Sequence, residues 1–202
     1  IGITKLNRAI QKLLSKQNPQ LIIVETSGSC HPLPLVEYFK NHSEVELTGL
    51  FNLVDSLMLA HDYNYGETLI PKMRNNLVNG KRGTVNLLVE QIMFCSHLIL
   101  TKADRIEQDK LAHIASYVNE INPYASAHSV LFGKLEIESL FELQPYNYFN
   151  VAQLVQELKP VLELEENEDK PYNIATRVIK DDRPFHPQRL WDICQQYLDE
   201  RI

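Results

Sequence analysis

Short apolar runs, each followed at once by a polar residue, constrain the fold of this chain more than any other feature. Three of them recur along the sequence: Leu21–Val24 before Glu25, Leu50–Val54 before Asp55, and Leu98–Leu100 before Thr101. The runs are too short for buried helices and are rich in β-branched residues, so they predict strands that are covered on both faces.

Helical stretches are expected between these strands, at 33–41, 85–96 and 107–121, and a fourth strand is expected at 126–131. Strands that alternate with helices predict an α/β fold with a parallel sheet. Such sheets bind their ligands at the carboxyl ends of the strands, which is where the polar residues stand. Residues 61–84 interrupt the pattern, and the sequence leaves open whether they contact a partner or cover a site.

The acidic run 165–171 predicts a solvated linker that divides the chain in two. The first part, 1–164, holds the strands and helices described above, between further helices expected at 3–16 and 151–164. The second part, 172–202, offers one strand and one helix, which cannot bury their apolar faces alone. We therefore expect one main domain followed by the start of a smaller α+β domain.

Composition excludes several classes of function. The chain has 202 residues and a formal net charge of −6, which argues against a general nucleic-acid binder because such proteins cluster Lys and Arg. No apolar run approaches the roughly 18 residues of a membrane span. The three cysteines stand far apart, so neither a disulfide framework nor a zinc finger is expected, and a reducing cytoplasm fits best.

The motif Thr101-Lys102-Ala103-Asp104 directly follows a predicted buried strand. A carboxylate at Asp104 could accept two parallel hydrogen bonds from the adjacent N1–H and N2–H₂ donors of guanine, which adenine lacks. Lys102 could lay its stem and charge over the purine ring, and the Thr101 hydroxyl could brace the neighbouring loop. The alternative is that Lys102 and Asp104 merely begin a helix, with Asp104 as its N-cap.

A second motif, Glu25-Thr26-Ser27-Gly28, also follows a predicted strand. An acidic residue at this edge can hold Mg²⁺ through water, and a glycine lets a backbone N–H approach a terminal phosphate. The alternative is a strand-to-helix turn in which Thr26 or Ser27 caps the next helix. The two motifs stand about 75 residues apart. Together they are stronger evidence for a nucleotide site than either motif is alone.

Ordered segments along nearly the whole chain resemble the CobW-type metallochaperone GTPases. They are Leu21–Gly28 with Pro32, Phe51–Asp55, Gln91–Asp104, Ile121–Ala125 and Arg183–Leu190. The resemblance implies a P-loop NTPase-like, mostly parallel sheet with helices on both faces, and a GTPase that delivers zinc, cobalt or iron to a client metalloprotein or a cofactor pathway such as cobalamin synthesis. It also assigns Glu25 and Gly28 to the Mg²⁺ and γ-phosphate motif, and Thr101, Lys102 and Asp104 to the guanine motif.

The sequence departs from that family in lacking a G-x-x-x-x-G-K-[ST] phosphate loop and a C-x-C-C metal motif. Both normally precede the helix at 3–16, so an absent N-terminal segment that includes the first strand is the simplest expectation, and the 202 residues alone should be inactive. The alternative is a complete, non-catalytic binding module that has lost its phosphate loop. A hydrolase with Ser27 or Ser29 as nucleophile would need G-x-S-x-G, and the chain has T-S-G-S-C instead.

Cys30 and His31 stand together in the loop beside the expected nucleotide edge. Thiolate and imidazole are zinc ligands, but adjacent residues rarely both reach one ion, and no further Cys or His follows at ligand spacing. Cys95 and Cys194 fall on apolar faces and are predicted to be buried.

Overall fold

The computed structural model describes residues 2–135, 143, 145–162 and 184–197. Its first half contains α1 (Ile3–Gln17), α2 (Leu33–Lys40), β1 (Phe51–Asp55), α3 (Ser56–Asp62), the 3₁₀ turn η1 (Asn64–Gly66) and α4 (Leu69–Val78). The second half contains α5 (Thr84–Phe94), β2 (His97–Thr101), the 3₁₀ turn η2 (Ala103–Arg105), α6 (Gln108–Ile121), β3 (Ser126–Ser129), α7 (Tyr148–Leu162) and α8 (Pro187–Tyr197). The helices predicted around 3–16, 33–41, 85–96, 107–121 and 151–164 are thereby confirmed.

The described strands form one parallel sheet in the order β1-β2-β3. The register pairs Phe51 with His97 and Asp55 with Thr101, so β1 and β2 end at the same level. The predicted α/β class is confirmed in this sheet. Since the carboxyl ends of both strands meet at one edge, the polar residues that follow them are brought together.

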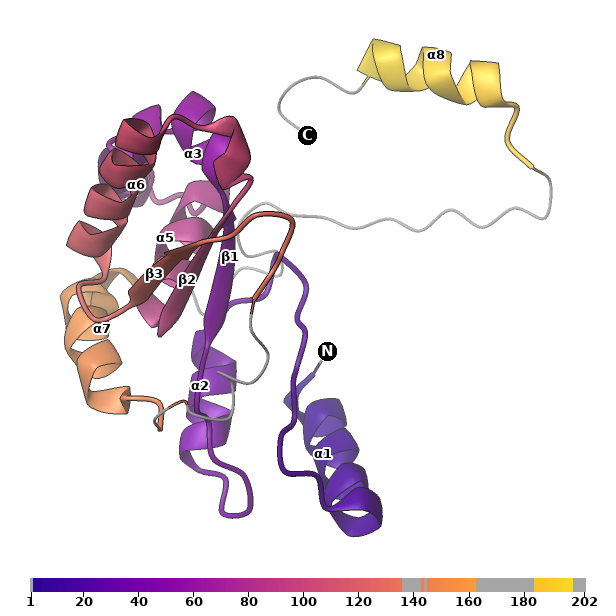
Figure 1. Cartoon of the computed structure of the whole chain (residues 1–202), viewed down its shortest axis with the longest axis vertical. Helices are drawn as coiled ribbons and strands as arrows, with labels where there is room; N and C mark the ends of the chain where they lie inside the picture. Colours follow the sequence, from indigo (N-terminus) through magenta and orange to yellow (C-terminus); the bar gives the residue numbers. More distant parts are fainter. Residues whose placement is uncertain (1, 136–142, 144, 163–183, 198–202) are drawn as a thin grey trace.

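The hydrophobic core lies on one face of the sheet, against α5 and α6 (Figure 1). Val54, Leu98 and Leu100 point from β1 and β2 into this core. Helix α5 is apolar around most of its circumference, and its buried residues include Val89, Ile92 and Phe94. It packs against α4, α6 and α7, so it is the central helix of the domain, and each large apolar side chain buried there contributes roughly 1.5 to 3 kcal/mol.

The strand predicted at Leu21–Val24 is not formed. Residues 20–26 have no regular secondary structure, and Ile23 and Val24 are 73% and 40% exposed. A buried strand needs neighbours for its backbone N–H and C=O groups, and β1 pairs only with β2 among the described residues. The other edge of β1 has no partner among the described residues, and Leu21–Val24 do not pair with it, so the prediction of a strand there was wrong.

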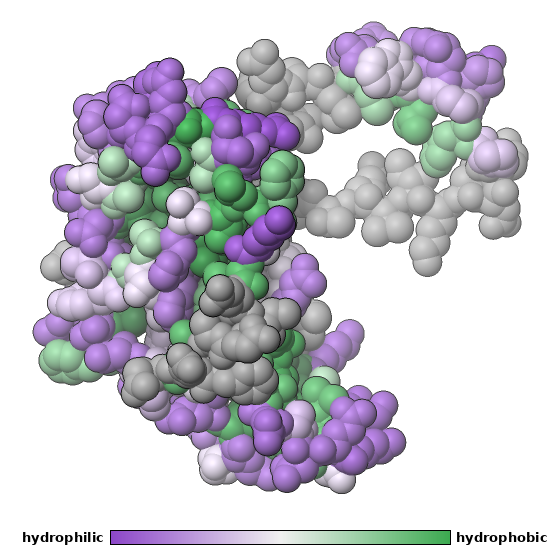
Figure 2. Space-filling model, viewed as in Figure 1, coloured by the Kyte–Doolittle hydropathy of each residue, from purple (hydrophilic) through white to green (hydrophobic). Residues whose placement is uncertain are grey.

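Helices on both faces of the sheet were also expected. The core cluster takes Leu98 and Leu100 from one face of β2, and Ile99, which points to the other face, is also buried at 5% exposed. On the opposite face of β1, Leu53 remains 68% exposed. Figure 2 shows apolar surface along β1 and the chain beside it, between the polar helices at one end and α1 at the other.

Residues 61–84 fold as the end of α3, η1 and α4, and they pack on the core. Leu69 and Met73 of α4 are buried against α5. Gly66 of η1 has φ +105°, and a Cβ there would lie 3.1 Å from the Cβ of Tyr117 in α6. The segment is therefore part of the main domain.

Two predictions fall on residues outside the described ranges, namely the linker at 165–171 and the strand within 172–202. The C-terminal helix is described as α8. The division into 1–164 and 172–202 stays a prediction. No helix in the described part of the chain has both the length and the apolar character that crossing a membrane requires.

Candidate functional site

The turn after β2 is fixed by its neighbour strand. The Thr101 hydroxyl donates a hydrogen bond to the carbonyl oxygen of Val54 in β1, at 3.2 Å. The next residue, Lys102, has φ 55°, in the left-handed region that non-glycine residues adopt at some energetic cost. Thr101 thus braces the adjacent strand end, and the chain reverses sharply at Lys102.

Asp55 connects this turn to helix α3. One of its carboxylate oxygens accepts hydrogen bonds from the backbone N–H groups of Leu57 (2.9 Å) and Met58 (3.4 Å), which makes it the N-cap of α3. The other oxygen accepts a hydrogen bond from the Lys102 ammonium. Burial raises the pKa of Asp55, but the Lys102 hydrogen bond, the two backbone hydrogen bonds and the Lys102 charge outweigh that effect, so the pKa is lowered overall. Asp55 stays ionised and holds Lys102 at the carboxyl edge of the sheet.

Asp104 lies in η2, immediately beyond the Lys102 turn. Its side chain is 36% exposed, and its nearest ionic neighbour is the Arg105 Nε at 3.9 Å, which is a weak contact. The N-cap of α6 is Glu107, so the alternative that Asp104 caps that helix is wrong. The carboxylate is presented to solvent at the end of the sheet, where a ligand can reach it.

A buried asparagine holds the opposite end of β2, where the strand begins. Asn122 is 1% exposed, and its side-chain amide donates to the carbonyl oxygens of Ile92 (2.9 Å), Met93 (3.1 Å) and Cys95 (2.9 Å). These carbonyls belong to the last turn of α5 and the residue after it, which no intrahelical N–H satisfies. Asn122 therefore fixes where α5 ends and where β2 begins.

The loop that carries Glu25 and Gly28 has a different kind of support. Glu25 is exposed, and the chain turns where the Cys30 N–H donates to the Ser27 carbonyl oxygen at 2.9 Å. Helix α2 has Pro32 as its N-cap and no side-chain capping bond, so the alternative in which Thr26 or Ser27 caps it is wrong. The side-chain amide of Gln91 in α5 donates to the carbonyl oxygens of Gly28 (2.8 Å) and Cys30 (3.1 Å). Side-chain contacts, and not a strand ladder, hold this loop.

Comparison with known proteins agrees with the order of these motifs. Residues 3–129 match the family model described as CobW/HypB/UreG, nucleotide-binding domain. This chain belongs to that family. A curated relative from Dictyostelium discoideum, zinc-regulated GTPase metalloprotein activator 1, is 22% identical over 196 residues, which cover 93% of this chain. The chain spans 41% of that relative's length. No solved structure matches the chain.

Within this CobW-family domain, the structure brings Thr101, Lys102 and Asp104 together at the carboxyl end of β2 and adds Asp55 beside them. Glu25 and Gly28 stand in a separate loop against α5. The roles of all five predicted residues, and the placement of Glu25 relative to Asp104 around one nucleotide, stay predictions.

Cys30 and His31 do not converge as metal ligands. The Cys30 thiol contacts the His31 carbonyl oxygen at 3.5 Å, and His31 Nε2 lies 2.9 Å from a carboxylate oxygen of Glu90. In the part of the chain that the structure describes, no group of three or more His, Cys, Asp or Glu could hold a metal ion. Glu25 suits Mg²⁺ in another way, since one exposed carboxylate with water and phosphate oxygens is an ordinary donor set for that ion.

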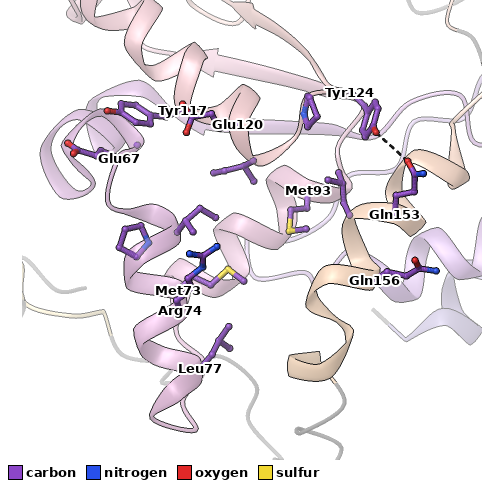
Figure 3. A pocket seen from close by; sticks show the side chains of 16 residues that line it. Glu67, Met73, Arg74, Leu77, Met93, Tyr117, Glu120, Tyr124, Gln153 and Gln156 are labelled. Atoms are coloured by element: carbon purple, nitrogen blue, oxygen red, sulfur yellow. Dashed lines mark hydrogen bonds between the residues drawn. The ribbon is translucent and has the colours of Figure 1, made fainter.

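A cavity of about 1160 Å³ lies away from these motifs. It is lined by residues of α4, α5, α6 and α7, including Met73 and Met93, and by Tyr124 just after α6 (Figure 3). The Tyr124 hydroxyl contacts the Gln153 side chain across its rim at 3.3 Å. None of the five predicted site residues lines this cavity, so its size alone does not make it the nucleotide site.

Sequence reasoning missed the roles of Asp55, Glu90 and Gln91. A signal existed for Asp55, because it ends a strand predicted to lie beside the one that delivers Thr101. A signal also existed on α5, where Glu90 and Gln91 interrupt an otherwise apolar helix. Lys102 lies 47 residues from Asp55 and Gly28 lies 63 residues from Gln91, so only the folded structure identifies these partners.

Proposed function

We propose that this chain is the base-recognising part of a GTP-binding and GTP-hydrolysing metallochaperone. Family membership supports nucleotide binding, and the name of the Dictyostelium relative supports GTPase activity with delivery of a metal ion, whether zinc, cobalt or iron, to a client protein. The partners proposed are therefore a guanine nucleotide and a client metalloprotein or cofactor-synthesis enzyme. The observation that carries the proposal is the exposed Asp104 carboxylate in a turn fixed by Thr101 and Lys102.

In this proposal Asp104 accepts the N1–H and N2–H₂ hydrogen bonds of guanine. Lys102, steered by Asp55, lays its aliphatic stem along one face of the purine, while its ammonium stays paired with that carboxylate. Thr101 keeps the turn in register with β1. Because hydrogen bonds within the chain hold the turn, little ordering entropy should oppose base recognition.

Glu25 and Gly28 act at the phosphate end. Glu25 would hold Mg²⁺ through a water molecule, and the ion would neutralise charge on the phosphate oxygens. The Gly28 N–H would donate to the terminal phosphate, which a backbone without a Cβ can approach closely. A glycine-rich phosphate loop with its Lys does not occur in these 202 residues, so we expect this chain by itself to hydrolyse GTP negligibly. Multiple turnover by the purified 202-residue chain would contradict that expectation.

The test of base recognition is a titration of the longest chain that the gene encodes with GDP and ADP. Asp104→Ala should reduce the preference for GDP by at least roughly tenfold, since two charge-assisted hydrogen bonds are lost. Asp109→Ala is the matched control, because Asp109 is another exposed carboxylate in the first turn of α6. Equal preference in wild type and Asp104→Ala would refute the assignment.

An exchange of donor pattern sharpens the test. Asp104→Asn presents one acceptor and one donor at the same place, a pattern that suits the N1–H and the C2 carbonyl of xanthine. We expect this variant to weaken GDP binding and to strengthen xanthosine diphosphate binding. A variant that loses both nucleotides alike would indicate that Asp104 supports the turn and does not read the base.

A further inference from the structure

Two adjacent residues of α5 hold the loop 25–31 from different sides. Gln91 donates both of its amide hydrogen bonds to backbone carbonyls of that loop, those of Gly28 and Cys30. Glu90 precedes it on the helix and lies 2.9 Å from the His31 imidazole. Neighbouring helical residues point about 100° apart, so the two side chains contact the loop at separate places.

Glu90 also connects the loop to the segment 61–84. The side chain is 2% exposed, and one of its oxygens accepts two hydrogen bonds from the Arg82 guanidinium, with Nε at 3.1 Å. Arg82 stands in the turn between α4 and α5 and is itself 9% exposed. A continuous path of side chains therefore runs from this turn through Glu90 to His31.

The hydrogen bonds fix both peptide groups that flank Gly28. The Gly28 carbonyl accepts from Gln91, and the peptide plane that contains it also contains the N–H of Ser29. The Ser27 carbonyl accepts from the Cys30 N–H, and its peptide plane contains the N–H of Gly28. Since each plane is rigid, the directions of the Gly28 and Ser29 N–H donors are set by these bonds, although Gly28 has no side chain to restrict it.

We propose that Gln91, assisted by Glu90, is a positioning residue that aims the backbone N–H of Ser29 toward the terminal phosphate of GTP, beside the Gly28 N–H that the Cys30–Ser27 backbone bond orients. This inference rests on the function proposed above and deepens it. Gln91 itself contacts no phosphate. It acts by orienting that donor in advance, so its contribution falls on the nucleotide that has a third phosphate and not on GDP.

The experiment compares Gln91→Glu with Gln108→Glu in the longest chain that the gene encodes. Gln91→Glu keeps the size of the side chain but places a carboxylate against two carbonyl oxygens, while Gln108 is exposed at the start of α6 and serves as the control. Dissociation constants are measured for GDP and for a non-hydrolysable GTP analogue, both with Mg²⁺. We expect Gln91→Glu to weaken binding of the analogue by roughly tenfold and binding of GDP by less than about twofold. Gln108→Glu should change neither affinity.

Gln91→Met removes the hydrogen-bond donors without adding charge. It should weaken binding of the analogue less than Gln91→Glu does, again with the affinity for GDP nearly unchanged. A general loss of folding would lower the affinity for both nucleotides together, and that result would overturn the inference. An unchanged ratio of the two dissociation constants, that of the GTP analogue to that of GDP, would overturn it as well. Suppose that GDP binding by the wild type depends on Asp104, but the ratio of the two dissociation constants is unchanged in Gln91→Glu. The inference then fails and the proposed function stands. If wild type binds no guanine nucleotide, both fail.

Discussion

The two ends of the proposed nucleotide site are held by different parts of the structure. The turn at Thr101–Asp104 follows a strand in the middle of the sheet, and the β1 ladder, the Thr101 hydrogen bond and the Asp55–Lys102 pair fix its position. The Asn122 amide fixes the other end of that strand. The loop at Glu25–His31 follows no strand and is held by side chains of α5. We infer that the base end is set by the core of the fold, whereas the phosphate end can be adjusted through a few polar contacts.

The largest loss of stability is expected at the start of β2, where the core holds the strand that carries the base-end turn. Asn122→Asp would place a carboxylate against three carbonyl oxygens at a site that is 1% exposed. We expect the free energy of unfolding to fall by at least about 4 kcal/mol, because three hydrogen bonds are lost and a charge is buried without a partner. Urea unfolding measures this. A loss below about 1 kcal/mol would show that the amide is not what fixes the end of α5.

Glu90→Ala tests the framework of the phosphate end. Removing the carboxylate takes from the nearly buried Arg82 guanidinium the two charge-assisted hydrogen bonds that Glu90 accepts, so the free energy of unfolding should fall by about 3 kcal/mol. Glu107→Ala is the control, since the Glu107–Lys110 pair lies on the exposed surface of α6 and should contribute little to stability. Equal losses in the two variants would remove the distinction between a buried and a surface pair.

Asp55→Asn sharpens the description of the base end. Asparagine also caps helix N-termini well, so α3 should persist, while the ion pair with Lys102 is lost. The pair is partly exposed, and we expect about 0.5 to 1 kcal/mol in GDP affinity, which is roughly a two- to fivefold increase in the dissociation constant. Isothermal titration measures it, and Asp62→Asn at the end of α3 is a suitable control. No change in affinity would mean that Asp55 serves only as a cap.

The smallest expected difference between the two regions is in the reactivity of their cysteine thiols. Burial raises the pKa of Cys95, between α5 and β2, to about 12, so at pH 8 it stays protonated and unreactive in the native protein. Cys30, in the phosphate-side loop, is only partly buried. We expect a thiol reagent at pH 8 to modify Cys30 well before Cys95, as read by peptide mass spectrometry. Equal rates would show that both regions open alike. Cys194 was predicted to be buried and is only partly so.

Periodicity in the sequence predicted most helices and three of the four strands correctly, because apolar spacing reports the face that an element buries. It failed at Leu21–Val24, where the residues favour a strand but make no ladder with β1 or with any other described strand. It also assigned to Thr26 or Ser27 a possible capping role that Pro32 takes instead. Local composition shows what a segment favours, and pairing depends on residues far away in the chain.

The sequence by itself determined the α/β class and the family and predicted the guanine motif, since these follow from spacing within short stretches and from the order of those stretches. Only the tertiary structure decided that Asp55 pairs with Lys102 and that Gln91 holds the Gly28 loop. The reason is physical: a hydrogen bond depends on distance and direction in space, and residues 47 or 63 positions apart reach bonding distance only when the sheet and α5 have packed.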